Sequence, residues 1–123
     1  MHISALKNRR ILVVEDDYMI AQDVRHDLER AGAIVVGPAP TVEKALGLIE
    51  SDPAVDAGVL DVNLGEERSF RVAEALDARA IPYLFATGYN SADIPDEWRH
   101  ATIATKPLRV EAVERLLTAS SAA

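Results

Sequence analysis

The sequence contains no cysteine, which excludes disulfide bonds, thiol catalysis and thiolate metal sites. Basic residues are few: 13 Lys and Arg stand against 20 Asp and Glu, giving a net charge of -7. This charge argues against direct nucleic-acid binding, which needs clustered basic side chains. The sequence also lacks an apolar run long enough to span a bilayer, and its first residues, MHISALKNRR, contain no signal-peptide core. We therefore expect a cytoplasmic protein without membrane insertion.

The remaining composition is that of a globular domain, with 49% hydrophobic and 27% charged residues. A chain of 123 residues is long enough to bury one sizeable core. We expect a single domain over residues 10–119, preceded by an extension at 1–9 and followed by a tail at 120–123.

Short apolar runs that predict buried strands alternate with segments of helical periodicity. The predicted strands are residues 10–14, 34–36, 57–60, 83–86 and 102–104. Helices are predicted at 18–31, after Thr41, from Ser69 to Arg79, and around 110–117, with Thr41 and Ser69 as caps. Gly37-Pro38 is expected to end the second strand, and a fourth helix within 88–100 is expected to be weak or irregular because of Gly88, Asn90 and Pro95. This order predicts an α/β fold, a single doubly wound parallel five-stranded sheet of flavodoxin-like type.

Polar residues follow the predicted strands at the carboxyl edge, where ligands bind in such folds. They are Glu15-Asp16-Asp17 after the first strand, Asp61 after the third, Thr87 after the fourth and Lys106-Pro107 after the fifth. Each alone has an ordinary explanation, since acidic residues favour helix N-termini and single polar residues often lie in solvated loops. Their combination in this order indicates a shared site. We assign Asp17 to capping of the following helix.

The motifs ILVVEDD, GVLDVNLG and TKP, together with the Thr87 position, resemble the receiver domain of two-component response regulators (CheY-like) over essentially the whole chain. The resemblance implies that Asp61 is the phosphoacceptor and that Mg²⁺ or Mn²⁺ binds beside it. Asp16 and Asp61 would bind the cation through carboxylates, Asn63 through its backbone carbonyl and Glu15 through water. Lys106 and Thr87 would contact phosphoryl oxygens, and Pro107 would follow a cis Lys-Pro bond.

The sequence departs from many receivers at Ile103, where an aromatic switch residue often stands three positions before the lysine. Instead, the motif FATGY at 85–89 resembles the FATGUY subclass, whose members typically work with sensor kinases of the HWE and related types. Gly88 frees the backbone after Thr87, and Tyr89 is a candidate for the missing aromatic switch. We expect the segment 88–100 to become ordered when Thr87 engages phosphate.

The resemblance implies a signalling module that catalyses only its own phosphorylation and dephosphorylation. Its partner would be a sensor histidine kinase or a phosphotransfer protein, and its state a monomer or weak dimer. One alternative is an aspartate-nucleophile phosphatase of the haloacid-dehalogenase type, but Asn63 stands where that family needs an acidic residue. A second is a flavodoxin-like cofactor binder, which would want a Gly- or Ser/Thr-rich loop in place of Glu15-Asp16-Asp17.

Three further features are interpreted as structural. The histidines at positions 2, 26 and 100 are expected on the surface, because they form no ligand-spaced cluster. Trp98 is expected to anchor an irregular segment, and residues 66–68 are expected to form a solvated loop.

Overall fold

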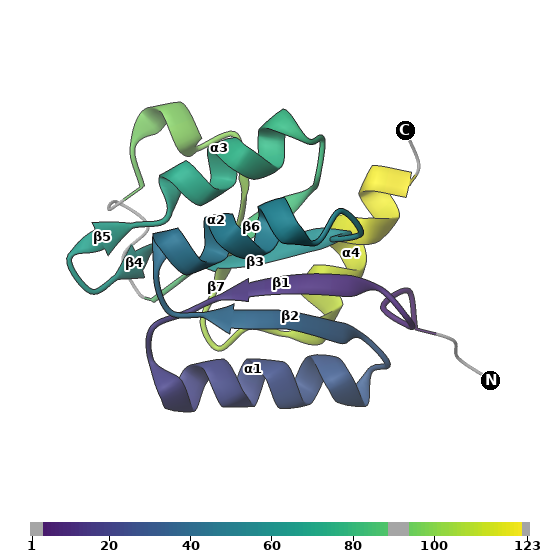
Figure 1. The fold of residues 1–123 in the computed structure, drawn as a ribbon. Coiled ribbons are helices and arrows are strands. Elements are labelled where there is room, and N and C mark those ends of the chain that lie inside the picture. The colour runs from purple at the N-terminus through teal and green to yellow at the C-terminus, as the bar shows by residue number, and fades with distance from the viewer. Residues whose placement is uncertain (1–3, 89–93, 122–123) are drawn as a thin grey trace.

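A computed structural model describes residues 4–88 and 94–121 of the chain. The five strands of its main sheet lie in the order β2-β1-β3-β6-β7, and all neighbouring pairs are parallel. They are β1 (Arg10–Val14), β2 (Ile34–Ala39), β3 (Ala57–Asp61), β6 (Tyr83–Thr87) and β7 (Thr102–Thr105). The predicted α/β fold with a parallel five-stranded sheet is therefore confirmed (Figure 1).

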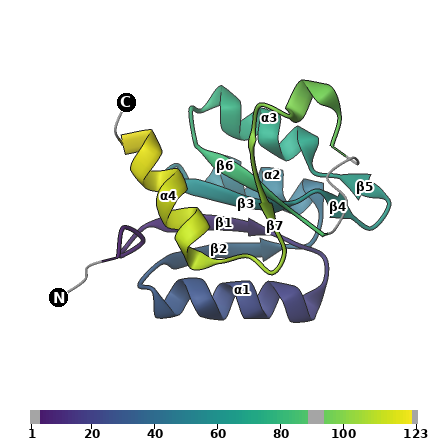
Figure 2. The same cartoon turned by 180° about the vertical axis from the view of Figure 1, so that it is seen from behind.

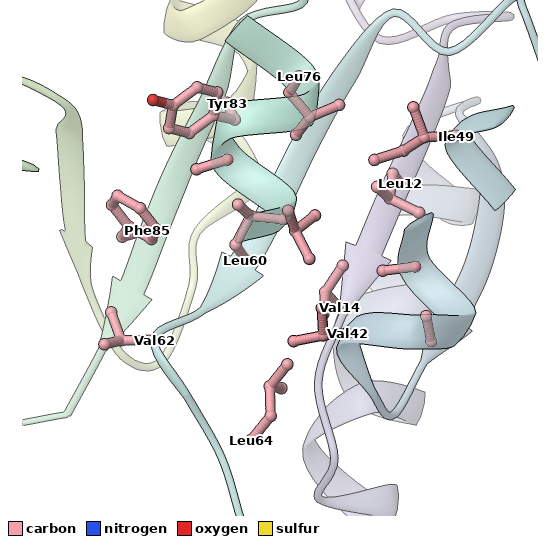
Figure 3. Close-up of a cluster of buried hydrophobic side chains, with 14 of the residues drawn as sticks. Leu12, Val14, Val42, Ile49, Leu60, Val62, Leu64, Leu76, Tyr83 and Phe85 are labelled. Atoms are coloured by element: carbon pink, nitrogen blue, oxygen red, sulfur yellow. The ribbon is translucent and has the colours of Figure 1, made fainter. Parts of the chain in front are cut away.

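Four α-helices connect and cover the strands: α1 (Tyr18–Arg30), α2 (Val42–Ser51), α3 (Phe70–Ala78) and α4 (Val110–Ser121). One buried cluster unites β1, β3 and β6 with α2 and α3, and it includes Leu12, Ile49 and Leu76 (Figure 3). A second cluster on the opposite face contains Leu28 of α1 and Val113 of α4. Figures 1 and 2 show the sheet between these two helical layers.

Two of the predicted caps differ in outcome. Thr41 accepts a hydrogen bond from the backbone N of Lys44 at 3.2 Å and caps α2 as predicted. Ser69 precedes α3 but makes no such bond, and its buried Oγ has no hydrogen-bond partner among the described residues. The capping prediction for Ser69 was wrong because its backbone (φ -84°, ψ 8°) is not in the extended conformation that directs a capping hydroxyl toward the helix.

The prediction that Gly37-Pro38 ends the second strand was also wrong. Strand β2 continues to Ala39, with a register shift where Leu12 pairs with Val36 and Val14 with Ala39. A proline is tolerated here because β2 is an edge strand, whose outer N–H groups have no ladder partner. The Gly37–Pro38 peptide bond is cis.

Residues 66–68 are exposed, as expected for a solvated loop, but they belong to a hairpin that the sequence analysis did not predict. Strands β4 (Asn63–Leu64) and β5 (Glu67–Arg68) pair in antiparallel fashion between β3 and α3. The hairpin lies beyond the end of the sheet toward which the arrows of β1 and β2 point (Figure 1). A third element outside the main sheet is a 3-10 helix, η2 (Asp96–Trp98). It is the one helical turn among residues 94–100, in agreement with a weak or irregular fourth helix.

Trp98 packs against the core from this irregular segment. Its ring stacks on Phe70 with centroids 5.6 Å apart and meets the edge of Phe85 at 5.9 Å. These contacts support the predicted anchoring role. His26 and His100 are exposed, whereas His2 lies outside the described residues.

The segment before β1 packs on the domain at the amino edge of the sheet. Leu6 is fully buried against the α1 and α4 layer, and Ser4 Oγ donates to Glu114 Oε2 at 2.8 Å. The backbone N of Asn8 donates to the carbonyl of Gly32. Part of the predicted extension thus contributes to the core, while the boundaries at residues 9/10 and 119/120 stay a prediction.

Candidate functional site

The topology brings the ends of β1 and β3 together. The chain leaves β1 toward β2 on one side and returns to β3 on the other, so the crossovers diverge between these two strands. Val14 is in register with Leu60, and the residues that follow, Glu15 and Asp61, therefore reach the same edge. A divergence of this kind leaves a crevice at the carboxyl ends of parallel strands, which is the usual ligand position in open α/β sheets.

Three carboxylates gather in that crevice. Oxygens of Glu15, Asp16 and Asp61 all lie within 4.8 Å of one another. Glu15 and Asp61 are buried, with 5% and 8% of their surface exposed, whereas Asp16 faces solvent. Burying like charges this closely is unfavourable unless a cation compensates them.

Lys106 supplies part of that compensation. Its Nζ donates to Glu15 Oε1 and to Asp61 Oδ2, each at 3.0 Å. The backbone N of Lys106 donates to the carbonyl of Thr87 at 2.7 Å, which fixes the lysine to the end of β6. The Lys106–Pro107 peptide bond is cis.

The electrostatics of the buried pair follow from these contacts. Burial, and after it the hydrogen bond with Asp61, raises the pKa of Glu15 to about 7, although Lys106 opposes the rise. Burial alone would lower the pKa of Lys106, but its bonds to Glu15 and Asp61 outweigh burial and leave it above the ordinary value. Near neutral pH, Glu15 is therefore close to its midpoint while Lys106 stays charged.

The remaining predicted residues surround this group. Thr87 is buried at the end of β6, where the preceding Ala86 is in register with Asp61. The backbone N of Asn63 donates to Asp61 Oδ1 at 3.3 Å. Gly88 is exposed and lines the cleft beside Asp61, whereas Tyr89 lies outside the described residues.

Asp17 stands apart from the carboxylate group, as predicted. Its side chain accepts a hydrogen bond from the backbone N of Ile20 at 3.1 Å and caps α1. Its own backbone N donates to Glu15 Oε2 at 3.1 Å, so the cap also helps to orient the buried carboxylate.

The site opens into a cleft of about 400 Å³, and the extension of this cleft along α1 was not predicted from the sequence. The cleft runs from Asp61 and Lys106 along α1, where Asp23, Val24 and Asp27 line it. The i, i+4 spacing of the two aspartates places them on one helix face, but only the fold shows that this face borders the cleft.

The donor set fits a divalent cation such as Mg²⁺. When Glu15 is also deprotonated, the three carboxylates and the Lys106 ammonium have a net charge of -2, and all three carboxylates offer oxygen ligands. Mg²⁺ prefers oxygen ligands and keeps several waters, which the exposed position of Asp16 allows.

In the parts of the chain that the structure describes, every helix is too short or too polar to cross a bilayer. Searches of family models and of curated proteins returned no match. Solved structures do match.

The solution structure of SdrG from Sphingomonas melonis Fr1 is 40% identical, with a TM-score of 0.78 over 96% of this chain and 98% of that one. The BeF3-activated conformation of SdrG from Pseudomonas melonis Fr1 is 38% identical, with a TM-score of 0.73 over 97% and 98%. A response regulator receiver protein from Sinorhizobium medicae WSM419 shares the fold at 24% identity, with a TM-score of 0.78 over 94% and 98%.

Forty per cent identity over nearly the full length of both chains is sufficient to assign a family. The sheet order and the carboxylates at the ends of β1 and β3 agree with that assignment. The chain belongs to the response regulator receiver (CheY-like) family.

Proposed function

We propose that the protein is the phosphoacceptor of a two-component phosphorelay and that Asp61 carries the phosphoryl group. The observation that supports this most directly is the placement of Asp61. Its carboxylate is held between Lys106 and the backbone N of Asn63, within 4.8 Å of two further carboxylates, and it opens onto a cleft.

The proposed reaction is a displacement at phosphorus. An Asp61 carboxylate oxygen attacks the phosphorus of a phosphohistidine. The new P–O bond forms as the P–N bond breaks, and its electron pair stays on the imidazole nitrogen. With a small phosphodonor, a P–O bond of the donor breaks instead. The product is an acyl phosphate, so catalysis consists of positioning and of neutralising charge.

The chain's own residues have distinct roles in this proposal. Lys106 exchanges its contact with Asp61 for a phosphoryl oxygen as a point charge, and the Thr87 hydroxyl donates to another. Glu15, Asp16, Asp61 and the backbone carbonyl of Asn63 would hold the cation. When bound, Mg²⁺ or Mn²⁺ would neutralise charge on the phosphoryl oxygens.

We assign the protein to the FATGUY subclass on the motif at residues 85–89, with an HWE-type histidine kinase or a phosphotransfer protein as its partner. The BeF3-activated conformation of SdrG supports a response to phosphoryl mimics. Gly88 and Tyr89 would form the switch, and phosphorylation would change partner binding or drain phosphate from the pathway. Ile103, 36% exposed on β7, leaves the usual aromatic switch position without a ring.

Intact-protein mass spectrometry after incubation with Mg²⁺ and acetyl phosphate tests the proposal. We expect one phosphoryl group on the wild type, none without Mg²⁺ and none on Asp61→Asn. Asp17→Asn is the matched control, because Asn is an equally good helix cap, and it should be phosphorylated like the wild type.

The protein could accept phosphate only from its kinase and then would not react with acetyl phosphate. A fluoroberyllate titration followed by NMR tests the site in that case. Saturable binding that requires Mg²⁺ and is lost in Asp61→Asn would uphold the site. If neither phosphorylation nor fluoroberyllate binding distinguishes the wild type from Asp61→Asn, the proposal is wrong. Continuous release of phosphate without a stable adduct would instead favour an aspartate-nucleophile phosphatase.

A further inference from the structure

The turn of the β4–β5 hairpin contains a glycine beside the carboxylate group. Leu64 pairs with Glu67, so Gly65 and Glu66 are the two turn residues. Gly65 has φ 66°, and among the described non-glycine residues only Asn8 and Ala80 have positive φ, so Glu66 does not. This is the pattern of a type II′ turn, in which glycine takes the first central position.

The hairpin is held in place on both sides. Leu64 is buried in the core cluster of α2 and α3, and the backbone N of Ser69 donates to the carbonyl of Val62 at 3.1 Å. On the site side, the backbone N of Asn63 donates to Asp61 Oδ1. The position of the turn relative to the carboxylates is therefore determined by the core and by the phosphoacceptor itself.

The direction in which a side chain would leave residue 65 leads toward Asp16. A Cβ on Gly65 would lie 3.7 Å from Asp16 Oδ2, the nearest neighbouring atom within 4 Å. Asp16 is the exposed member of the three carboxylates, so residue 65 borders the solvent side of the group.

We propose that Gly65 is a positioning residue for the divalent cation, an inference that rests on the function proposed above. The backbone of the turn closes the hairpin over Asp16, while the missing side chain leaves room for the water shell of the cation. Mg²⁺ bound to a protein usually keeps several waters, which need space beside its carboxylate ligands. A methyl group 3.7 Å from Asp16 Oδ2 would be in van der Waals contact with this oxygen and would cover part of the exposed carboxylate on which the cation and its waters depend.

Two substitutions separate crowding from backbone strain. Gly65→Ala adds one methyl group but is strained at positive φ, whereas Gly65→Asn introduces a residue that is more frequent than Ala in turns of this kind and adds a larger group. We expect both to weaken Mg²⁺ binding roughly tenfold, as is typical when the surroundings of metal ligands change. Isothermal titration with Mg²⁺, and with Mn²⁺ as a second probe, measures this on the unphosphorylated protein.

Gly32→Ala is the matched control. It makes the same chemical change at a residue with φ 97°, but the added Cβ would meet Lys7, at the opposite edge of the sheet. We expect it to lower the melting temperature and to leave the Mg²⁺ dissociation constant within twofold of the wild-type value. Circular dichroism of each variant without metal confirms folding.

Weaker cation binding in both Gly65 variants, with Gly32→Ala unaffected, would support the inference. Wild-type affinity in a folded Gly65→Asn would overturn it, and so would weaker binding in Gly32→Ala as well, because strain would then be the cause. All of these outcomes presuppose that the wild type binds the cation, so they are distinguishable from a failure of the proposed function. If the wild type itself binds no cation, the metal site of the proposed function fails and this inference fails with it.

Discussion

Lys106 Nζ lies 3.0 Å from Glu15 Oε1 and 3.0 Å from Asp61 Oδ2, so one ammonium group joins the ends of β1 and β3. Both carboxylates are buried. Removal of the Lys106 ammonium group would therefore leave repulsion between Glu15 and Asp61 that solvent cannot fully screen. The stability of the unphosphorylated domain therefore depends on a residue that the proposed reaction also uses.

Lys106→Gln should lower the free energy of unfolding at pH 8 by about 1–3 kcal/mol, because Glu15 and Asp61 lose their compensating charge. The loss should be smaller at pH 5, where Glu15 is protonated. Urea unfolding at the two pH values measures this. Lys44→Gln, on the exposed face of α2, is the control and should change stability by less than about 0.5 kcal/mol. An equal loss at both pH values would contradict the charge explanation.

The raised pKa of Glu15 predicts a particular pH dependence of stability. Its folded value of about 7 lies above the ordinary value of 4.5, so the folded state binds the proton more tightly. Unfolding free energy should fall by about 1–3 kcal/mol as the pH rises from roughly 4.5 to 7 without metal. Glu15→Gln should remove most of this slope. If the slope persisted in Glu15→Gln, another group would be responsible.

Cation binding should show the opposite pH trend, because the cation competes with the proton on Glu15. Saturating Mg²⁺ should raise the melting temperature little at pH 5 and clearly at pH 8, and a chelator should reverse the effect. Differential scanning fluorimetry at both pH values checks this, with Asp16→Asn as the control that loses most of the Mg²⁺ effect. A Mg²⁺ effect that is the same at both pH values would argue against Glu15 as a cation ligand.

Leu6→Ala should destabilise the protein by about 2–4 kcal/mol, as expected for truncating a fully buried leucine. Met19→Ala is a matched truncation of a side chain that is 69% exposed, and it should cost less than about 0.5 kcal/mol. Chemical unfolding of both variants compares them directly. Similar stabilities would mean that the segment before β1 does not contribute to the core in solution.

Gly47→Ala should stabilise the protein by about 0.5–1 kcal/mol, because Gly47 lies within α2 and an added Cβ would meet nothing within 4 Å. Gly37→Ala makes the same change where the Cβ would lie 2.7 Å from the backbone N of Ala39, and it should destabilise. Melting temperatures of the two variants should therefore move in opposite directions. Movement in the same direction would contradict the steric argument.

The order in which the five strands of the main sheet and the four α-helices follow along the chain could be predicted from the sequence, because each of these elements depends on a local pattern. Strand β1 was predicted with its observed bounds, and α1 was predicted to within one residue at its end. Asp17 was correctly assigned to the α1 cap, since capping involves residues three positions apart. The motifs at the strand ends identified the candidate site residues for the same reason.

Features that depend on residues far apart in the chain became known only from the fold. Only the cluster formed by α1, α4 and the sheet shows that Leu6 is buried, and only the position of the hairpin shows that residue 65 lies beside Asp16. The bridge from Lys106 to Glu15 spans 91 positions in sequence, so no local pattern predicts it. Its geometry and the raised pKa of Glu15 arise when the fold brings these charges together and removes them from water.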